Sequence, residues 1–234
     1  MKTVLALAAK DLRAESRGRQ VAPVMVVFAL CLVFLLTFAL PPGALRAPVP
    51  APRAGALGAR DLSGLMLWTT ILFAGILGFG RSATVDREGS AADGLLLAPV
   101  DPAAIYTGKM LGNLAYLTAA ELFAIPLFVL FANVPVGGLL PGIIPVALVA
   151  NIGLAAVGTL FGAATQHAEA RSLLLPLLTF PLALPVVLGA SKLTSTLLIE
   201  RGFGSESRWF ILLSVFDVVF VTLGAVTFEF VIEE

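Results

Sequence analysis

Six apolar stretches, each about 20 residues long, limit what this chain of 234 residues can fold into. About 20 helical residues cross a bilayer core about 30 Å thick. Irregular backbone cannot face lipid, because its N–H and C=O groups find no partner there. We therefore predict an all-α integral membrane protein with a single transmembrane domain, residues 1–234. Its six predicted spans are about 21–40, 62–80, 110–134, 143–164, 172–190 and 209–226.

The composition agrees with this class and excludes others. Apolar residues make up 59% of the chain and charged residues 13%, against about 25% charged residues in globular proteins. The formal net charge is zero, so no basic field attracts nucleic acid and we expect no nucleic-acid partner. Cys31 is the only cysteine, so neither an intrachain disulfide nor a thiolate metal cluster can form.

Residues 1–19 are predicted to form an amphipathic helix on the membrane surface, because their apolar positions recur with helical spacing between basic ones. A frayed polar tail is the alternative interpretation. Six spans put both ends of the chain on one side of the membrane. Cytoplasmic loops carry an excess of Lys and Arg, and placing the N-terminus in the cytoplasm leaves more of these residues inside than outside.

The longest polar interval, Arg81 to Lys109, separates the second and third predicted spans. Its charges alternate in sign, and Leu95 to Leu97 form a short apolar patch that can pack on a partner. Asp101 and Pro102 are typical of a helix start, with Asp as the N-cap and Pro at the first helical position. We predict a cytosolic docking loop, with apolar anchors and orienting charges at Leu95, Leu96, Asp86, Arg87 and Glu88.

Two carboxylates, Glu121 in the third predicted span and Asp217 in the sixth, are candidate functional residues because charge is costly inside a membrane. No Lys or Arg lies deep in a predicted span to pair with them. One hypothesis is a proton-coupled carrier that uses either carboxylate. The other is a protonated or hydrogen-bonded carboxyl that faces the bundle near Asn113, Thr118 or Asn151. The two matching halves with discontinuous helices that are typical of carriers are not found.

No catalytic or metal site is predicted. The motifs Gly-x-Ser-x-Gly and His-Glu-x-x-His are absent, and His167 is the only histidine, without a second ligand near it. Gly108 and Lys109 lack the earlier glycine and the following Ser or Thr of a phosphate-binding loop, so we expect no nucleotide site in this chain. Gly-x-x-x-Gly motifs at 108–112 and 158–162 predict close helix packing within the bundle.

Several segments together resemble the haem exporter permease of the cytochrome c maturation system, a membrane component of the ABC-2 class of transporters. The loop departs from that pattern, because Ala91-Ala92-Asp93-Gly94 stands where similar proteins show Leu-Glu two residues after the loop glycine. The segments that carry the resemblance are Lys10 to Arg17, Asp86 to Ser90, Leu95 to Pro99, Gly108-Lys109, Gly158 to Thr165 and the proline-rich stretch Arg171 to Pro185.

The resemblance implies a non-enzymatic permease of an ATP-binding-cassette exporter in the bacterial plasma (inner) membrane, with both termini cytoplasmic. It binds no cofactor directly. Haem is either the transported substrate or stays on a chaperone that ATP hydrolysis releases, and ATP binds to a separate subunit that docks on the loop. Further expected partners are haem-handling membrane subunits, membrane lipid and a second copy of the chain. An ABC-2 exporter for another substrate and the proton-coupled carrier are the alternatives.

Overall fold

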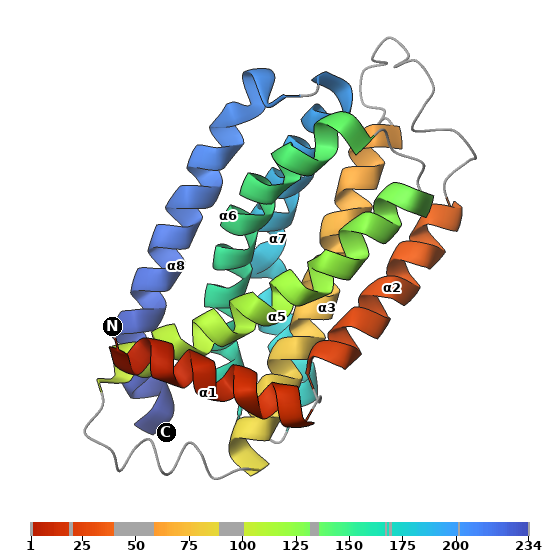
Figure 1. Ribbon diagram of the computed structural model, residues 1–234. Helices are drawn as coiled ribbons and strands as arrows, with labels where there is room; N and C mark the ends of the chain where they lie inside the picture. Colours follow the sequence, from red (N-terminus) through yellow and green to blue (C-terminus); the bar gives the residue numbers. More distant parts are fainter. Residues whose placement is uncertain are drawn as a thin grey trace.

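The computed structural model describes residues 2–18, 21–39, 59–88, 101–131, 136–166, 168, 170–200 and 202–233. In these ranges the regular elements are all helices, and six of them are long and apolar enough to cross a membrane (Figure 1). The predicted all-α class with six transmembrane helices is therefore confirmed. The candidate spans are Ala22–Ala39, Asp61–Thr84, Pro102–Phe131, Pro141–Ala164, Ser172–Ile199 and Arg208–Val231.

The helix α6 occupies the centre of the bundle, where it packs against α3, α5, α7 and α8. The short helix α1 lies across one end and packs on α5, and both ends of the chain are at this end (Figure 1). The elements are α1 (Lys2–Gly18), α2 (Ala22–Ala39), α3 (Ala59–Glu88), α5 (Pro102–Phe131), α6 (Val136–Ala164), α7 (Arg171–Glu200), the short 3-10 helix η1 (Gly204–Ser207) and α8 (Arg208–Glu233).

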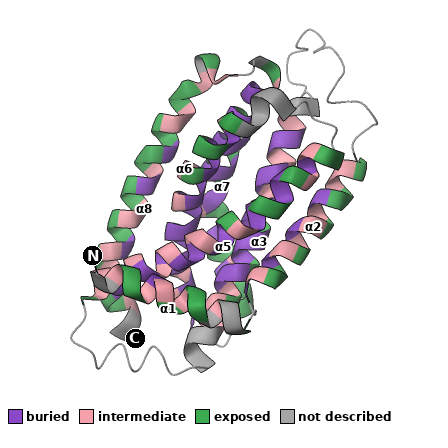
Figure 2. Cartoon of the chain, viewed as in Figure 1, coloured by how far each residue is buried: buried purple, intermediate pink, exposed green. Residues whose placement is uncertain are grey.

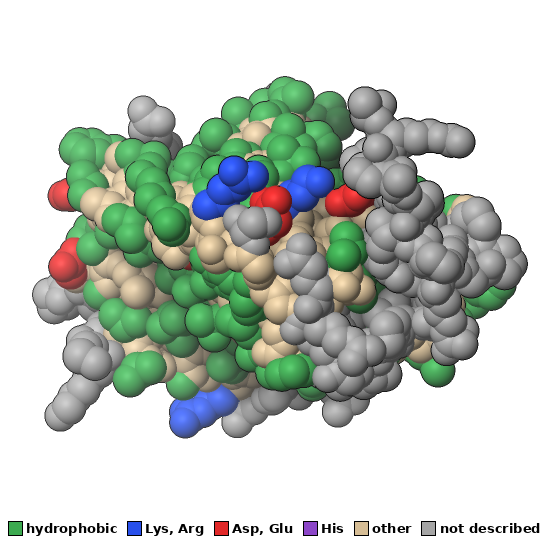
Figure 3. Space-filling view, turned by 90° about the horizontal axis from the view of Figure 1, so that it is seen from above, with side chains coloured by type: hydrophobic (Ala, Val, Ile, Leu, Met, Phe, Trp, Pro, Cys, Tyr) green, Lys and Arg blue, Asp and Glu red, His purple; other side chains and the backbone are tan. Residues whose placement is uncertain are grey.

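Burial follows this arrangement. In the most apolar part of each span, 67% of the residues of α3 and α6 are buried, but only 22% of α2 and 17% of α8 (Figure 2). Seen from the end opposite the termini, hydrophobic side chains cover much of the described surface, and a few basic and acidic side chains lie beside one another (Figure 3). The exposed side chains of the outer helices include large apolar ones, such as Phe34 and Leu35 of α2 and Val215 and Val218 of α8. These helices therefore present apolar faces of the kind that lipid or another membrane helix covers.

Of the two helices that flank the predicted docking loop, α3 extends further than the sequence indicated. Residues 81–88 were predicted as loop, but they continue α3 to Glu88. They contain neither Gly nor Pro, so a helix can satisfy their backbone hydrogen bonds. At the other side, the N–H of Ala103 donates to Asp101 Oδ1 at 2.9 Å, and α5 begins at Pro102. The predicted helix start at Asp101 and Pro102 is therefore confirmed.

Two other helices are also longer than the predicted spans. α6 begins at Val136 and passes through Pro141, although the fourth span was expected to begin at residue 143. α7 runs unbroken to Glu200, although the fifth span was expected to end at residue 190. In lipid an unpaired backbone group costs more than a proline inside a helix, so continuing the helix is favoured.

Polar contacts hold the final turns of α7 against α3. Trp68 Nε1 donates to Thr194 Oγ1 at 2.8 Å, and Ser195 Oγ donates to Asp61 Oδ1 at 2.8 Å. Lys192 Nζ lies 3.3 Å from the same Asp61 oxygen. Because these polar side chains are paired, the segment after Ala190 can remain packed in the bundle.

Candidate functional site

The last turn of α3 lies at the end of the bundle that carries α1 and both chain ends (Figure 1). Asp86, Arg87 and Glu88 form the last turn of α3, and their side chains are outside the part that the structure describes. Leu95 and Leu96 also lie outside the described residues. The position of the two flanking helices is thus known (Figure 1), and the docking contact stays a prediction.

Glu121 of α5 is paired inside the bundle. Its side chain is buried, with 3% of the residue exposed, and Asn151 Nδ2 donates to Glu121 Oε2 at 2.7 Å. This is the hydrogen-bonded arrangement near Asn151 that the sequence offered as one of two hypotheses. The other oxygen of Glu121 and the amide oxygen of Asn151 have no hydrogen-bond partner among the described residues.

A second polar pair joins the same two helices. Asn113 Nδ2 donates to Thr159 Oγ1 at 2.8 Å. The two pairs follow one antiparallel register of α5 on α6, and eight residues of helix put about 12 Å between them. Leu117 and Ala155 occupy the intermediate positions, and both are fully buried. A proton relay needs polar groups within hydrogen-bond reach of one another, so these pairs are better suited to holding the helices together.

Asp217 of α8 has a different environment. It is 8% exposed, and its Oδ1 has no hydrogen-bond partner in the described ranges. It faces Gly153 of α6, where an added Cβ would lie 2.7 Å from that oxygen. No hydrogen bond between described residues links Asp217 to Glu121. The structure therefore places the two candidate carboxylates against different positions of α6, and Gly153 is a contact that sequence reasoning missed.

The elbow between α1 and α2 contains a contact that the sequence did not indicate. Glu15 Oε1 accepts hydrogen bonds from the N–H groups of Val21 at 2.9 Å and Ala22 at 2.8 Å. The first N–H groups of a helix lack internal partners, and the positive end of the helix dipole favours a carboxylate there. Glu15 therefore caps the first span from the preceding helix. The only signal in the sequence is an acidic residue shortly before a span.

The Gly-x-x-x-Gly motif at 108–112 lets α1 lie close to α5. A Cβ added to Gly108 would lie 2.8 Å from Leu7 Cβ, and one on Gly112 would lie 3.7 Å from Asp11 Cβ. Tyr116 Oη donates to the backbone oxygen of Asp11 at 3.3 Å. The expected packing of this motif within the bundle is therefore confirmed. α1 rests on the half of α5 that directly follows the predicted docking loop.

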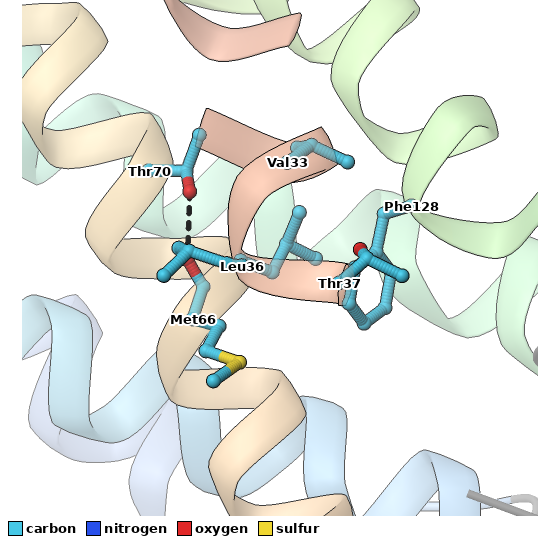
Figure 4. Close-up of a pocket in the computed structure, with 7 residues that line it drawn as sticks. Val33, Leu36, Thr37, Met66, Thr70 and Phe128 are labelled. Atoms are coloured by element: carbon cyan, nitrogen blue, oxygen red, sulfur yellow. Dashed lines mark hydrogen bonds between the residues drawn. The ribbon is translucent and has the colours of Figure 1, made fainter. Parts of the chain in front are cut away.

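A small hollow among α2, α3 and α5 has no chemistry of its own (Figure 4). It has no room for a water molecule, and the hydroxyl of Thr70 donates to the Met66 backbone oxygen at 2.9 Å. It is a packing gap. Its lining consists of Val33, Leu36, Thr37, Met66, Leu67, Thr70 and Phe128.

The described residues contain no group of three His, Cys, Asp or Glu side chains that could hold a metal ion. His167 lies outside the described residues. The features above define a multi-pass helical membrane protein with an N-terminal helix across one end and buried polar pairs between its central helices.

The family model described as CcmB protein matches residues 2–233. The chain therefore belongs to this family, which comprises the haem exporter permeases of cytochrome c maturation. The resemblance seen in the sequence is confirmed, and the chain is a transporter membrane subunit that is not itself catalytic. No curated protein sequence matches the chain at a significant level.

Proposed function

We propose that this chain is the permease of an ABC exporter complex whose separate ATPase subunit docks on the loop between α3 and α5. The observation that carries the proposal is the family match over residues 2–233. Asp86, Arg87 and Glu88 supply orienting charges in this contact, and Leu95 and Leu96 supply apolar anchors. The complex lies in the bacterial plasma membrane with both termini of the chain in the cytoplasm.

The helix α5 is suited to transmit movement from such a contact. It begins at Pro102, just after the loop, and it packs against α1, α2, α3, α6 and α8. A displacement of the loop by ATP binding or hydrolysis in the partner is therefore passed to most of the bundle. Packed helices shift between discrete arrangements rather than deforming continuously.

ATP-driven release of a haem-loaded chaperone fits this chain better than passage of haem through it. Histidine is an axial ligand of haem iron in globins, peroxidases and cytochromes c. The only histidine, His167, lies outside all six candidate spans. The complex also includes haem-handling membrane subunits and a second copy of this chain in our proposal.

The test is the variant Leu95→Asp, expressed with the ATPase subunit and purified in a gentle detergent. An aspartate buried in an apolar groove costs several kcal/mol, so the affinity should fall by more than about a hundredfold. We expect normal membrane insertion, loss of ATPase co-purification and loss of cytochrome c maturation. The control, Ala92→Asp, adds the same charge to the same loop without removing an anchor, and it should retain the ATPase. Undiminished ATPase binding by Leu95→Asp would contradict the proposed contact.

The orientation is tested by cysteine labelling in intact cells after Cys31 is replaced by serine. Ser90→Cys should react only when the reagent can enter the cytoplasm, and Ser205→Cys should react with an impermeant reagent. The opposite pattern would reverse the proposed topology.

A further inference from the structure

A small polar pocket lies where α3, α5 and α6 meet, near the C-terminal ends of α3 and α6 and the N-terminal end of α5. This is the end of the bundle that carries α1 and both chain ends (Figure 1). The pocket has about 20 Å³ of space, and polar atoms form a large part of its wall. It therefore differs from the packing gap among α2, α3 and α5, whose wall is almost entirely apolar and which has no room for water.

Polar side chains from three parts of the chain border this pocket. Its inner part includes Asn113 of α5 and Thr159 of α6, which are 5% and 4% exposed, and Gln166, which follows α6 and is 7% exposed. Ser82 of α3 and Lys109 of α5 also line it, and they are only partly buried. The pocket therefore extends from the helix ends into the buried part of the bundle.

The size of the pocket limits what it can hold. A single water molecule needs about 10–15 Å³ of such space and two to four polar partners. A phosphate ion, a lipid head group and haem are all larger than the space of about 20 Å³. A dry pocket would leave polar atoms of its wall without hydrogen bonds, which costs free energy, and cavities that stay dry are apolar. Water is the occupant that fits both the size and the chemistry.

We propose that this pocket is the binding site of one ordered water molecule, which joins α3, α5 and the end of α6 through Ser82, Lys109 and Gln166. The hydroxyl and the amide can each donate or accept a hydrogen bond. The ammonium group has three donors, so one of them can serve the water beside any other contact. The water lies next to the Asn113–Thr159 pair, which also borders the pocket.

The proposed site also marks how far water enters the bundle from this end. Beyond Asn113, the fully buried side chains of Leu117 and Ala155 separate the pocket from the Glu121–Asn151 pair. Water from this end therefore reaches Asn113 but not Glu121. The inference does not depend on the proposed function, because it concerns only the interior of this chain.

The test is hydroxyl-radical labelling of the full chain in lipid nanodiscs by a brief X-ray exposure, followed by mass spectrometry. The radicals form from water where it lies, so a buried side chain is oxidised when a water molecule is beside it. Phe79 lines the polar pocket and Phe128 lines the dry packing gap. They are a matched pair, because they are 2% and 3% exposed. We expect Phe79 to be oxidised and Phe128 to stay unmodified.

Two substitutions at Asn113 test the site itself. Asn113→Leu and Asn113→Ser both remove the amide that bonds to Thr159, but they change the pocket in opposite ways. Leucine is larger than asparagine and apolar, so it fills the space and displaces the water. Serine is smaller and polar, so the pocket stays wet. We expect the oxidation of Phe79 to be lost in Asn113→Leu and retained in Asn113→Ser.

Equal oxidation of Phe79 and Phe128 in the wild type would overturn the inference, and so would equal oxidation of Phe79 in the two Asn113 variants. Phe128 also reports on folding, because it becomes oxidised if the bundle opens. If Asn113→Leu opens the bundle, the comparison of Phe79 with Phe128 in the wild type decides alone. Loss of ATPase co-purification would contradict the proposed function and leave this inference unchanged.

Discussion

Phe79 of α3 lies so close to Gly158 of α6 that a methyl group cannot be added there without displacement. An ideal Cβ on Gly158 would lie 2.2 Å from two ring carbons of Phe79, whereas carbon atoms in contact stay about 3.5–4.0 Å apart. Phe79 is only 2% exposed, so its ring has little space to move into. At Gly162, one turn further along α6, the nearest atom to a new Cβ would be 3.8 Å away.

These two glycines should therefore respond in opposite ways to alanine. Overpacking costs about 1–3 kcal/mol, and alanine in place of a helical glycine regains about 0.5–1 kcal/mol. The ring is rigid and buried, so the upper end of the first range applies at Gly158. Gly158→Ala should lower the free energy of unfolding by about 2 kcal/mol, a factor of about 30. Gly162→Ala meets only ordinary contacts and should raise it by about 0.5–1 kcal/mol.

The assay is reversible unfolding of the purified chain in mixed micelles, followed by tryptophan fluorescence. Trp68 is fully buried and reports on the same helix as Phe79. Phe79→Leu should recover part of the loss when it is added to Gly158→Ala, because the smaller side chain makes room for the methyl group. Equal changes in stability for the two alanine variants would refute this description of the contact between α3 and α6.

Two further substitutions test other parts of the bundle. Glu121→Gln combined with Asp217→Asn should leave cytochrome c maturation intact, because the permease does not use these carboxylates for proton transfer; loss of maturation by a correctly inserted, stable double variant would favour a carrier. Glu15→Ala should destabilise the chain by about 1–2 kcal/mol, because the first N–H groups of α2 lose their cap, while Glu15→Gln should lose less. Equal unfolding curves for Glu15→Ala and the wild type would show that water replaces the cap.

Hydropathy and local chemistry predicted the number of spans, because lipid requires long apolar helices whatever their neighbours are. The N-cap at Asp101 was also predictable. Its side chain accepts a hydrogen bond from the N–H of Ala103, only two residues away, so the contact depends on the local sequence alone. The helix ends after Gly80 and before Ile143 were placed wrongly. Polarity and proline were taken as signs of loop, but α3 and α6 continue because a helix satisfies the backbone on its own.

The contacts between helices were not predictable in the same way. Hydropathy does not fix how α5 is rotated or shifted against α6, and this register brings Glu121 to Asn151 and Asn113 to Thr159. The sequence named Asn151 among three candidate neighbours without choosing it. The two oxygens of the Glu121–Asn151 pair that lack a partner among the described residues are likewise recognised only when both helices are in place. Leu95 and Leu96 lie outside the described residues, so their docking role stays a prediction.

The central proposal is that this permease works only when a separate subunit hydrolyses ATP. The most direct measurement is covalent haem staining of c-type cytochromes in cells where that ATPase binds ATP but cannot hydrolyse it. The permease itself should still insert and co-purify with the inactive ATPase. We expect the stained cytochromes to be lost under these conditions. Undiminished cytochrome c maturation with the inactive ATPase would contradict the proposal.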